Sequence, residues 1–404
     1  MKIKHVEAIA VSLPMKKPVF MAGVEIRTAD NVLVRIEAGN GVVGWGEAAS
    51  APSMTGETVE SMMAAIGYLA PAVEGREAED IAGTIAVMRQ RMYANNAAKA
   101  AIEIALHDLL GHASGRPAYA ILGTRQRSRM PLLGVIGTGA LSSDLREAER
   151  KKAQGYAAYK IKVGIDRPLI DAERTRGVCA LIGRGALISS DANQGWSTDE
   201  AVQYVRAVAD AGLTFFEQPV HADDIAGLTA VADAAEKAGQ IAIGADESIH
   251  SLADVRTMHE RRAARGVSLK TIKLGGMRGV LAAGRLCQEL GLNVNVAAKT
   301  GESSIACAAA MHVAAALPQL AWGLTLSSDG LAEDVTARPI AVEGGHVEIS
   351  DAPGLGIEVD EERVRRHRRD VPIRSVAAAD SVGHLLTENP AAIGRSATPT
   401  DITV

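Results

Sequence analysis

Cysteine is scarce in this sequence, and the few cysteines are not placed as a metal site or a disulfide framework would require. The 404 residues contain three cysteines, Cys179, Cys287 and Cys307, which lie far apart along the chain. Cysteines that bind metal or form redox pairs usually stand close together in the sequence. We therefore expect three reduced, buried and inert thiols, as is typical of the reducing cytoplasm.

Long apolar runs and a cleavable leader are also missing. A membrane-spanning helix needs roughly 18 or more uninterrupted apolar residues, and the sequence has no such stretch. The first residues, MKIKHVEAIAVSLPM, lack the apolar centre and the small-residue cleavage site of a signal peptide. The expectation is a cytoplasmic protein without a membrane partner.

Basic and aromatic residues do not gather into a surface of the kind that binds nucleic acid. The net charge is −5, aromatic residues make up 3% of the chain, and no basic run is interleaved with aromatics. Proteins that bind nucleic acid usually carry a basic patch or stripe. Nucleic acid is therefore not an expected partner, although the apolar content of 47% is ordinary for a globular protein.

The pattern of hydrophobicity changes along the chain and indicates more than one domain. The length corresponds to roughly two to three domains of about 150 residues. Residues 1–50 alternate as antiparallel strands do, and the period becomes helical over residues 58–122. This predicts an α+β domain over residues 1–128. Residues 333–370 are expected to return to that domain, and residues 371–404 to form a tail.

Short apolar runs alternate with Ala-rich helical stretches over residues 129–332. Eight such runs with intervening helices are the pattern of a β/α barrel, in which the strands end together at one face. The fold class predicted is therefore α/β, a barrel joined to a smaller α+β domain. The runs cover residues 131–136, 157–163, 186–190, 213–217, 240–245, 266–272, 292–297 and 321–326.

Charged residues stand near the C-terminal ends of five consecutive runs, at intervals of 24 to 29 residues. Catalytic residues of β/α barrels come from the C-terminal ends of different strands, because these ends meet at one mouth. The regular spacing therefore predicts a site built from several strands. The residues are Lys160 and Lys162, then Asp191, Glu217, Asp246 and Lys270.

The three acids of this series predict a divalent cation. Each acid alone could be a helix N-cap, a common role for an acid after a strand. Three carboxylates that converge without a counterion would repel one another, and this would raise their pKa values. Mg²⁺ prefers oxygen ligands, so it would relieve the repulsion. The sequence has no His/Cys cluster of the kind that binds zinc.

The lysines of the series allow several interpretations. Lys160 and Lys162 share one face of their strand, because side chains alternate along a strand. If the two lysines face the barrel interior, they are a costly defect in the core, a pair that binds a carboxylate, or a catalytic pair. The alternative is that they face the helices or solvent. Lys270 lies on the sixth run, which is opposite the second in a closed barrel. Lys162 and Lys270 would therefore lie on opposite sides of a substrate bound to the metal. Lys273 follows the expected end of its strand and is predicted to be a solvated loop lysine.

Several motifs together resemble those of the enolase superfamily, in its mandelate racemase and muconate-lactonising-enzyme family, and more narrowly those of the muconate-lactonising-enzyme subgroup. The resemblance covers about residues 1–365 and implies a modified TIM-type barrel under an α+β cap formed by the N-terminal region and the C-terminal segment. The motifs are WGEA at 45–48, KIK at 160–162, DANQGW at 191–196, EQP at 217–219, GADES at 244–248 and SLKTIKLGG at 268–276.

The resemblance also implies roles for individual residues. Lys162 and Lys270 would be the acid/base pair, and Lys160 would help to lower the pKa of the base and contact the substrate carboxylate. Asn193 and Glu247 would support the site. A homo-oligomer is common in the resembled family. The implied ligands of Mg²⁺, with Mn²⁺ as a substitute, are Asp191, Glu217 and Asp246.

The seventh run and the N-terminal region bear on the substrate. The racemase branch has a His on the seventh strand, whereas LNVNVAAKTGES has none, which favours the branch with two lysines. Glu302 matches an acidic position with a hydrogen-bonding role. Lys299 is an additional cation, either a ligand for a second substrate anion or a solvated loop lysine. Met21 and Arg27, in the lid segment 13–31, are predicted substrate contacts or else packing or surface residues.

The predicted activity is removal of the proton alpha to the carboxylate of a small-molecule substrate, which forms a metal-stabilised enediolate. A lysine can act as the base if its pKa falls toward the working pH, and a His or Lys base with Mg²⁺ is typical of the resembled superfamily. We expect an isomerase, either a cycloisomerase or a racemase or epimerase. The alternatives are a dehydratase on the same site, an aldolase with a Schiff-base lysine, and a non-catalytic metal-binding barrel.

Overall fold

The N-terminal region forms a three-stranded antiparallel sheet covered by helices. The computed structural model describes residues 1–21, 24–239 and 241–369. The strands pair in the order β1-β2-β3. Alternate residues of the first strand, such as Ile9, Val11 and Leu13, are buried, as expected for a sheet with one covered face. The strands are β1 (Ile3–Met21), β2 (Val24–Ala38) and β3 (Val43–Ala49), followed by helices α1 (Val59–Val73), α2 (Ile81–Arg91) and α3 (Asn96–Ser114).

Two glycines allow helix α3 to lie directly on strand β3. A Cβ atom at Gly46 would stand 1.9 Å from the carbonyl oxygen of Ala101, and one at Gly44 would stand 2.3 Å from that of Ala105. Any side chain at either position would push the helix off the sheet. The helix ends at Gly115, whose φ of 66° places it in the left-handed region that favours glycine.

The eight strands from β5 to β12 are parallel to one another, and each overlaps one predicted run. They are hydrogen-bonded in chain order from β5 to β12, and a parallel bridge between Leu132 and Leu324 joins the last strand to the first. The α/β barrel predicted from the sequence is confirmed. The strands are β5 (Leu133–Ile136), β6 (Ala158–Lys162), β7 (Leu187–Asp191), β8 (Phe215–Glu217), β9 (Ala242–Ala245), β10 (Gly266–Leu269), β11 (Asn293–Ala297) and β12 (Leu324–Thr325).

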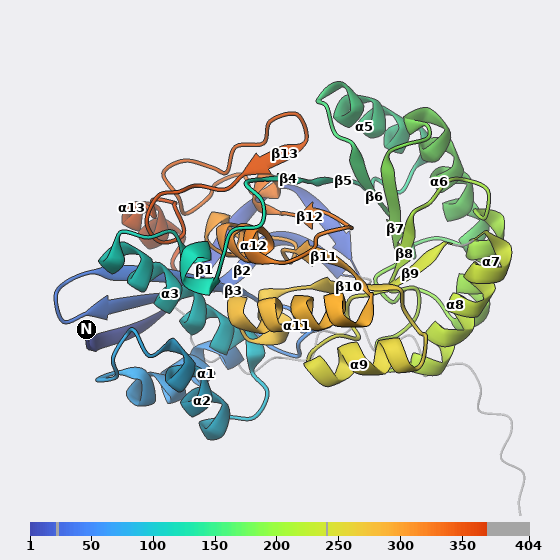
Figure 1. Ribbon diagram of the computed structural model, residues 1–404. Coiled ribbons are helices and arrows are strands. Elements are labelled where there is room, and N and C mark those ends of the chain that lie inside the picture. The colour runs from blue at the N-terminus through green and yellow to red at the C-terminus, as the bar shows by residue number, and fades with distance from the viewer. Residues whose placement is uncertain (22–23, 240, 370–404) are drawn as a thin grey trace, which may run out of the picture. The chain divides into compact units, whose positions relative to one another are not determined.

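Helices surround the strands, as Figure 1 shows for the arc from α5 to α9 outside β5 to β9. At the N-terminal ends of the strands, the rings of Phe215 and Trp322 stack at 4.0 Å and 5°, and they pack with Leu133 and Ala158. The barrel is therefore apolar at this end and carries its charged groups at the other. The helices are α5 (Leu141–Ala153), α6 (Pro168–Ile182), α7 (Thr198–Ala207), α8 (Ile225–Ala238), α9 (Leu252–Glu260), α10 (Thr271–Leu274), α11 (Met277–Leu290) and α12 (Ser304–Ala316).

The buried carboxylate of Glu47 joins strand β3 to the barrel. It accepts hydrogen bonds from the backbone amides of Ser303 and Ala306, at 2.9 and 3.0 Å, and from the Ser303 hydroxyl at 2.6 Å. It thereby satisfies free amides at the N-terminus of helix α12. Asn31 donates to Glu47 and to the carbonyl oxygen of Gly301. These bonds fix the loop after β11 against the N-terminal sheet.

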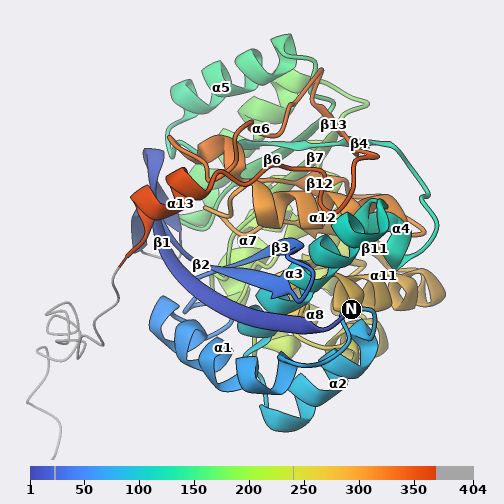
Figure 2. The ribbon, with the colours of Figure 1, turned by 90° about the vertical axis from the view of Figure 1, so that its left-hand side faces the viewer.

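The chain after the barrel returns to strand β1. Val11 and Arg368 form an antiparallel bridge, and the amide of Arg369 donates to the carbonyl oxygen of Ala10 at 2.8 Å. Figure 2 shows α13 beside β1, the long dark-blue strand. The domain boundaries at residues 128 and 332 stay a prediction. The remaining elements are α4 (Ala118–Leu122), β4 (Arg129–Pro131), the 3-10 helix η1 (Ser328–Gly330), β13 (His346–Glu348) and α13 (Glu361–His367).

The predicted tail, residues 371–404, lies outside the described residues. Within residues 1–21, 24–239 and 241–369, no helix has the length and apolar character needed to cross a membrane.

Candidate active site

A cavity of about 440 Å³ opens at the C-terminal ends of the barrel strands. The N-terminal region closes part of it with Met15, Lys16, Lys17 and Val19 of β1, and with Met54. The lid segment 13–31 expected from the sequence therefore contributes to the wall. Seven of the predicted site residues line the cavity, namely Lys160, Lys162, Asp191, Asn193, Asp246, Lys270 and Lys299.

The register of the strands brings the charged residues together. Lys162 is opposite Asp191 in the β6–β7 pair, and Asp191 is opposite Glu217 in the β7–β8 pair. Lys162 Nζ lies 2.6 Å from Asp191 Oδ2. Lys160 Nζ lies 2.6 Å from Glu217 Oε2 and 3.8 Å from Asp191 Oδ2. Both lysines therefore face the inside of the barrel, and neither faces the helices.

Asp246 lies between two lysines. Lys270 Nζ contacts its Oδ2 atom, and Lys273 Nζ lies 2.6 Å from its Oδ1 atom. The prediction that Lys273 is a solvated loop residue is wrong, because its side chain is 0% exposed and also donates to the carbonyl oxygen of Ser268 at 3.0 Å. Strand β10 stops at Leu269, earlier than expected, and the single turn of α10 folds Lys273 back under the strand ends.

Asn193 and Glu247 form a hydrogen-bonded support beside the lysines. Lys162 donates to Asn193 Oδ1 at 2.7 Å, and Asn193 Nδ2 donates to Glu247 Oε1 at 3.0 Å. The backbone amide of Asn193 donates to Asp191 Oδ1 at 3.0 Å. The amide side chain thus ties the second, third and fifth strand ends together.

Gln218 is a supporting residue that the sequence analysis missed. Its side-chain oxygen accepts hydrogen bonds from the backbone amides of Asp246 and Ser248, at 2.8 and 3.2 Å. Its φ of 36° is unusual for a residue other than glycine, and strain of this kind often accompanies a functional site. The signal in the sequence was the EQP motif, in which a polar residue stands between a strand end and Pro219.

Burial raises the pKa values of the carboxyl groups, whereas the neighbouring ammonium groups lower them. Burial alone would raise the pKa of Asp191 and of Asp246, but the neighbouring ammonium groups outweigh it and lower both pKa values. Glu217 has a raised pKa because burial exceeds the effect of Lys160. Burial and the charge of Asp246 raise the pKa of Glu247 to about 7.

Lys270 does not show the lowered pKa that the sequence analysis expected for a base. Burial would lower the pKa of Lys270, but the carboxylates of Asp246 and Glu247 raise it above the usual value. The pKa of Lys160 is raised in the same way by Glu217 and Asp191. Direct contact with carboxylates explains the difference, since an opposite charge favours the charged form of a lysine.

The chemistry of the three acids fits a hard divalent cation. Asp191 and Asp246 line the cavity, Glu217 lies on the strand between them, and all three are almost fully buried. Carboxylate oxygens are the ligands that Mg²⁺ prefers. Across the described ranges no three His, Cys, Asp or Glu side chains already converge as a metal-binding group, because each of the three carboxylates here is turned toward a lysine.

Lys299 and Glu302 are both buried in the loop after β11. Lys299 is 9% exposed and lines the cavity, so its interpretation as a solvated loop lysine is wrong. Glu302 Oε2 accepts a hydrogen bond from the backbone amide of Lys299 at 3.0 Å. Burial, together with the charge of Glu47, raises the pKa of Glu302 to about 8.

We expect Glu302→Gln to weaken the pH dependence of folding stability. The pKa of Glu302 rises from 4.5 to about 8 on folding, so its contribution is fully present below pH 4.5 and is lost as the pH rises to about 8. Between pH 4.5 and about pH 8 the unfolding free energy of the parent should therefore fall, and that of the variant should fall by about 2–4 kcal/mol less. Urea unfolding at several pH values measures this. Glu289→Gln, an exposed change on α11, is the control, and equal slopes in all three proteins would contradict the expectation.

The two predicted contacts of the lid segment remain untested. Arg27 is 72% exposed, pairs with Glu25 at 2.9 Å and is not among the residues that line the cavity. Met21 is the last residue of β1, and its side chain lies outside the part of the structure that is described.

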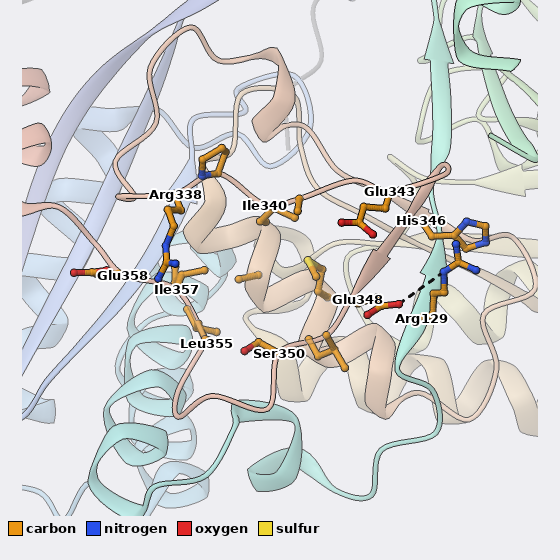
Figure 3. A pocket seen from close by; sticks show the side chains of 16 residues that line it. Arg129, Arg338, Ile340, Glu343, His346, Glu348, Ser350, Leu355, Ile357 and Glu358 are labelled. Carbon is orange, nitrogen blue, oxygen red and sulfur yellow. Dashed lines mark ion pairs between the residues drawn. The ribbon is translucent and has the colours of Figure 1, made fainter. Parts of the chain in front are cut away.

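A second cavity, of about 490 Å³, lies between helix α12, the β4–β13 pair and the segment that follows the barrel. Figure 3 shows charges of both signs on its wall, among them Arg129, Arg338 and Glu343, with Arg129 and Glu348 4.0 Å apart. None of the lysines or carboxylates described above lines it. The chemistry therefore belongs to the first cavity.

Comparison with known families gives two matches that together cover most of the chain. Residues 144–363 match the family described as enolase C-terminal domain-like. Residues 4–123 match the N-terminal domain of mandelate racemase and muconate lactonizing enzyme.

Individual relatives are similar along their full length. The chain is 30% identical over 374 residues to chloromuconate cycloisomerase of Cupriavidus necator, covering 91% of this chain and 100% of the relative. It is 32% identical over 360 residues to L-Ala-D/L-Glu epimerase of Bacillus subtilis, covering 88% and 97%. The crystal structure of muconate lactonizing enzyme from Pseudomonas fluorescens with muconolactone superimposes with a TM-score of 0.86 at 28% identity, covering 91% and 99%.

Proposed function

The chain belongs to the mandelate racemase and muconate lactonizing enzyme family of the enolase superfamily, and from this membership we propose a reaction, a metal and the residues responsible. It is an isomerase of the muconate cycloisomerase and racemase type, which acts on a small carboxylic acid. The proposed reaction is transfer of the proton on the carbon alpha to the substrate carboxylate. The arrangement of two lysines around Asp191 and Asp246 in one cavity, with Glu217 buried on the strand between these two acids, carries this proposal.

Membership of the family implies a divalent metal, and we propose that it is Mg²⁺, with Mn²⁺ as a substitute. Asp191, Glu217 and Asp246 would hold it. A bound dication would supply positive charge to the substrate carboxylate and so make the alpha proton easier to remove. In the structure the negative charge of these three acids is balanced by the lysines that contact them.

Lys162 and Lys270 are the proposed acid and base. They stand at the ends of β6 and β10, which are the second and sixth strands of the eight. Strands four positions apart lie across the barrel from each other, so the two amines reach a substrate between them from opposite sides. Removal of the proton by one neutral Nζ, followed by delivery of a proton from the other, protonated Nζ on the opposite side, would invert the carbon. We therefore propose racemisation or epimerisation as the first candidate.

Lys160, Asn193 and Glu247 would keep this arrangement in place. Lys160 holds Glu217, and Asn193 orients Lys162 through a hydrogen bond and links it to Glu247. A lysine must be neutral before it can act as a base, so Lys162 would have to release its proton and leave Asp191 before it takes a proton from a substrate. Glu302 would hold the backbone of the loop that carries Lys299.

Cycloisomerisation is the second candidate. The similarity to chloromuconate cycloisomerase, which covers all of that relative, favours it. It would use a single lysine, which transfers a proton at the alpha carbon while a lactone opens or closes. A dehydratase would use the same groups.

We also propose that the protein is cytoplasmic, in keeping with three buried cysteines that form no disulfide. We propose in addition that it forms a homo-oligomer.

Solvent-deuterium exchange tests the proposed function. The enzyme with Mg²⁺ would be incubated in D₂O with a library of N-acyl amino acids, dipeptides, hydroxy acids and unsaturated dicarboxylates. We expect deuterium at the alpha carbon of at least one class, measured by NMR, and chiral chromatography would show whether the carbon inverts. Absence of exchange across the library, or trapping of a substrate by borohydride, would contradict the proposal and favour a Schiff-base aldolase.

A further inference from the structure

Lys299 is a buried lysine in the wall of the cavity. Its side chain is nine-tenths buried. Within the described ranges its ammonium group makes no ion pair and no hydrogen bond. The bonds of this residue run through its backbone, whose amide donates to Glu302 Oε2 at 3.0 Å and whose carbonyl oxygen accepts from Ser327 Oγ at 2.8 Å.

The other buried lysines of the cavity differ in this respect. Lys160 pairs with Glu217, Lys270 pairs with Asp246, and the half-buried Lys162 pairs with Asp191. A buried charge without a partner is costly, so its retention calls for a partner that arrives from outside. Asp329 also lines the cavity but forms no ion pair with Lys299.

The loop that carries Lys299 is fixed in place. The carbonyl oxygen of Gly301 accepts from Asn31 at 2.8 Å, and Ser303 is bound to Glu47. Gly301 has a φ of 88°, and a Cβ there would stand 2.7 Å from the Cβ of Ala29. The loop therefore packs tightly on the N-terminal sheet and holds the Lys299 backbone at one position relative to the metal-ligand candidates.

We propose that Lys299 is a specificity-determining residue, which binds a second anionic group of the substrate, remote from the carboxylate whose alpha carbon lies between Lys162 and Lys270. This inference rests on the proposed function, since it takes the cavity as the substrate site. The substrate class is then a dianion, most simply a dicarboxylate. Burial lowers the pKa of Lys299 and raises the pKa of Glu302 to about 8, and Glu302 and Asp30 are close enough for their charges to act on Lys299. A second anion from the substrate would therefore hold Lys299 in its charged form.

Binding of unreactive acids tests this role separately from catalysis. Succinate, glutarate, adipate and pimelate would be titrated calorimetrically into the Mg²⁺-loaded enzyme, each beside the monocarboxylate with the same number of carbons. We expect at least one dicarboxylate to bind more tightly than its partner acid. Lys299→Met, which keeps the length of the side chain and removes the charge, should reduce this preference about 10- to 100-fold, as expected for loss of a charge-assisted hydrogen bond.

Lys17→Met is the matched control, since it removes an exposed lysine from the wall of the same cavity. An equal loss of preference in Lys17→Met would overturn the proposal in favour of a general effect of positive charge. A parent enzyme that binds both acid series equally, or an unchanged preference in Lys299→Met, would also overturn it. Deuterium exchange measured on the same proteins tests the proposed proton transfer. The proposed reaction and the proposed role of Lys299 can therefore be contradicted independently.

Discussion

Lys162→Ala and Lys270→Ala are each expected to lose racemisation or epimerisation by a factor of about 10²–10⁴, the contribution typical of a positioned acid or base. The two lysines approach the substrate from strands on opposite sides of the barrel. Inversion needs both, so either variant should block it. Exchange of the alpha proton should persist only for the stereoisomer whose proton faces the lysine that remains. Deuterium exchange by NMR, begun from each stereoisomer, measures both effects.

Binding of Mg²⁺ should survive in both variants. Asp191 keeps Lys160 at 3.8 Å when Lys162 is removed, and Asp246 keeps Lys273 at 2.6 Å when Lys270 is removed. Calorimetry with Mg²⁺ therefore separates a lost acid or base from a collapsed site. Lys237→Ala, on the exposed face of helix α8, serves as the control. Full exchange with every stereoisomer in both variants would remove the two lysines from the mechanism.

Asp246→Asn should have the second large effect, because it acts on metal binding and on folding at once. The carboxylate contacts Lys270 and Lys273, which are both buried. Its loss leaves two ammonium groups without their counterion, and breaking a buried ion pair costs about 3–5 kcal/mol. We expect a lower unfolding free energy in urea, weaker Mg²⁺ binding by calorimetry and no detectable turnover.

Two further variants make this result interpretable. Asp329→Asn changes an exposed carboxyl group on the wall of the same cavity and should leave stability and metal affinity close to those of the parent. Asp191→Asn removes a candidate ligand whose nearer partner, Lys162, is 25% exposed, so folding should suffer less while metal affinity falls. Unaltered Mg²⁺ affinity in both Asp191→Asn and Asp246→Asn would show that these acids hold no metal.

The sequence predicted the barrel and the main site residues because both depend on short-range regularities. Period-two alternation placed Lys160 and Lys162 on one face, and the recurring β-α unit placed Asp191, Glu217 and Asp246 at neighbouring strand ends. The pairings of Lys162 with Asp191 and of Asp191 with Glu217 in the strand register agree with this. Such regularities can be read within about 30 residues, without knowledge of what packs on each strand.

Only the tertiary structure decided the burial and the partners of the other residues. Lys273 looked solvated until an early end to β10 and the turn of α10 placed it under Asp246. Lys299 was open to two interpretations until the N-terminal sheet covered its loop through Asn31 and Glu47. Glu47 and Ser303 are 256 residues apart, and no local pattern encodes a contact of that separation. Burial is set by distant segments that pack together, and burial is what distinguishes a charge that binds a ligand from one that water surrounds.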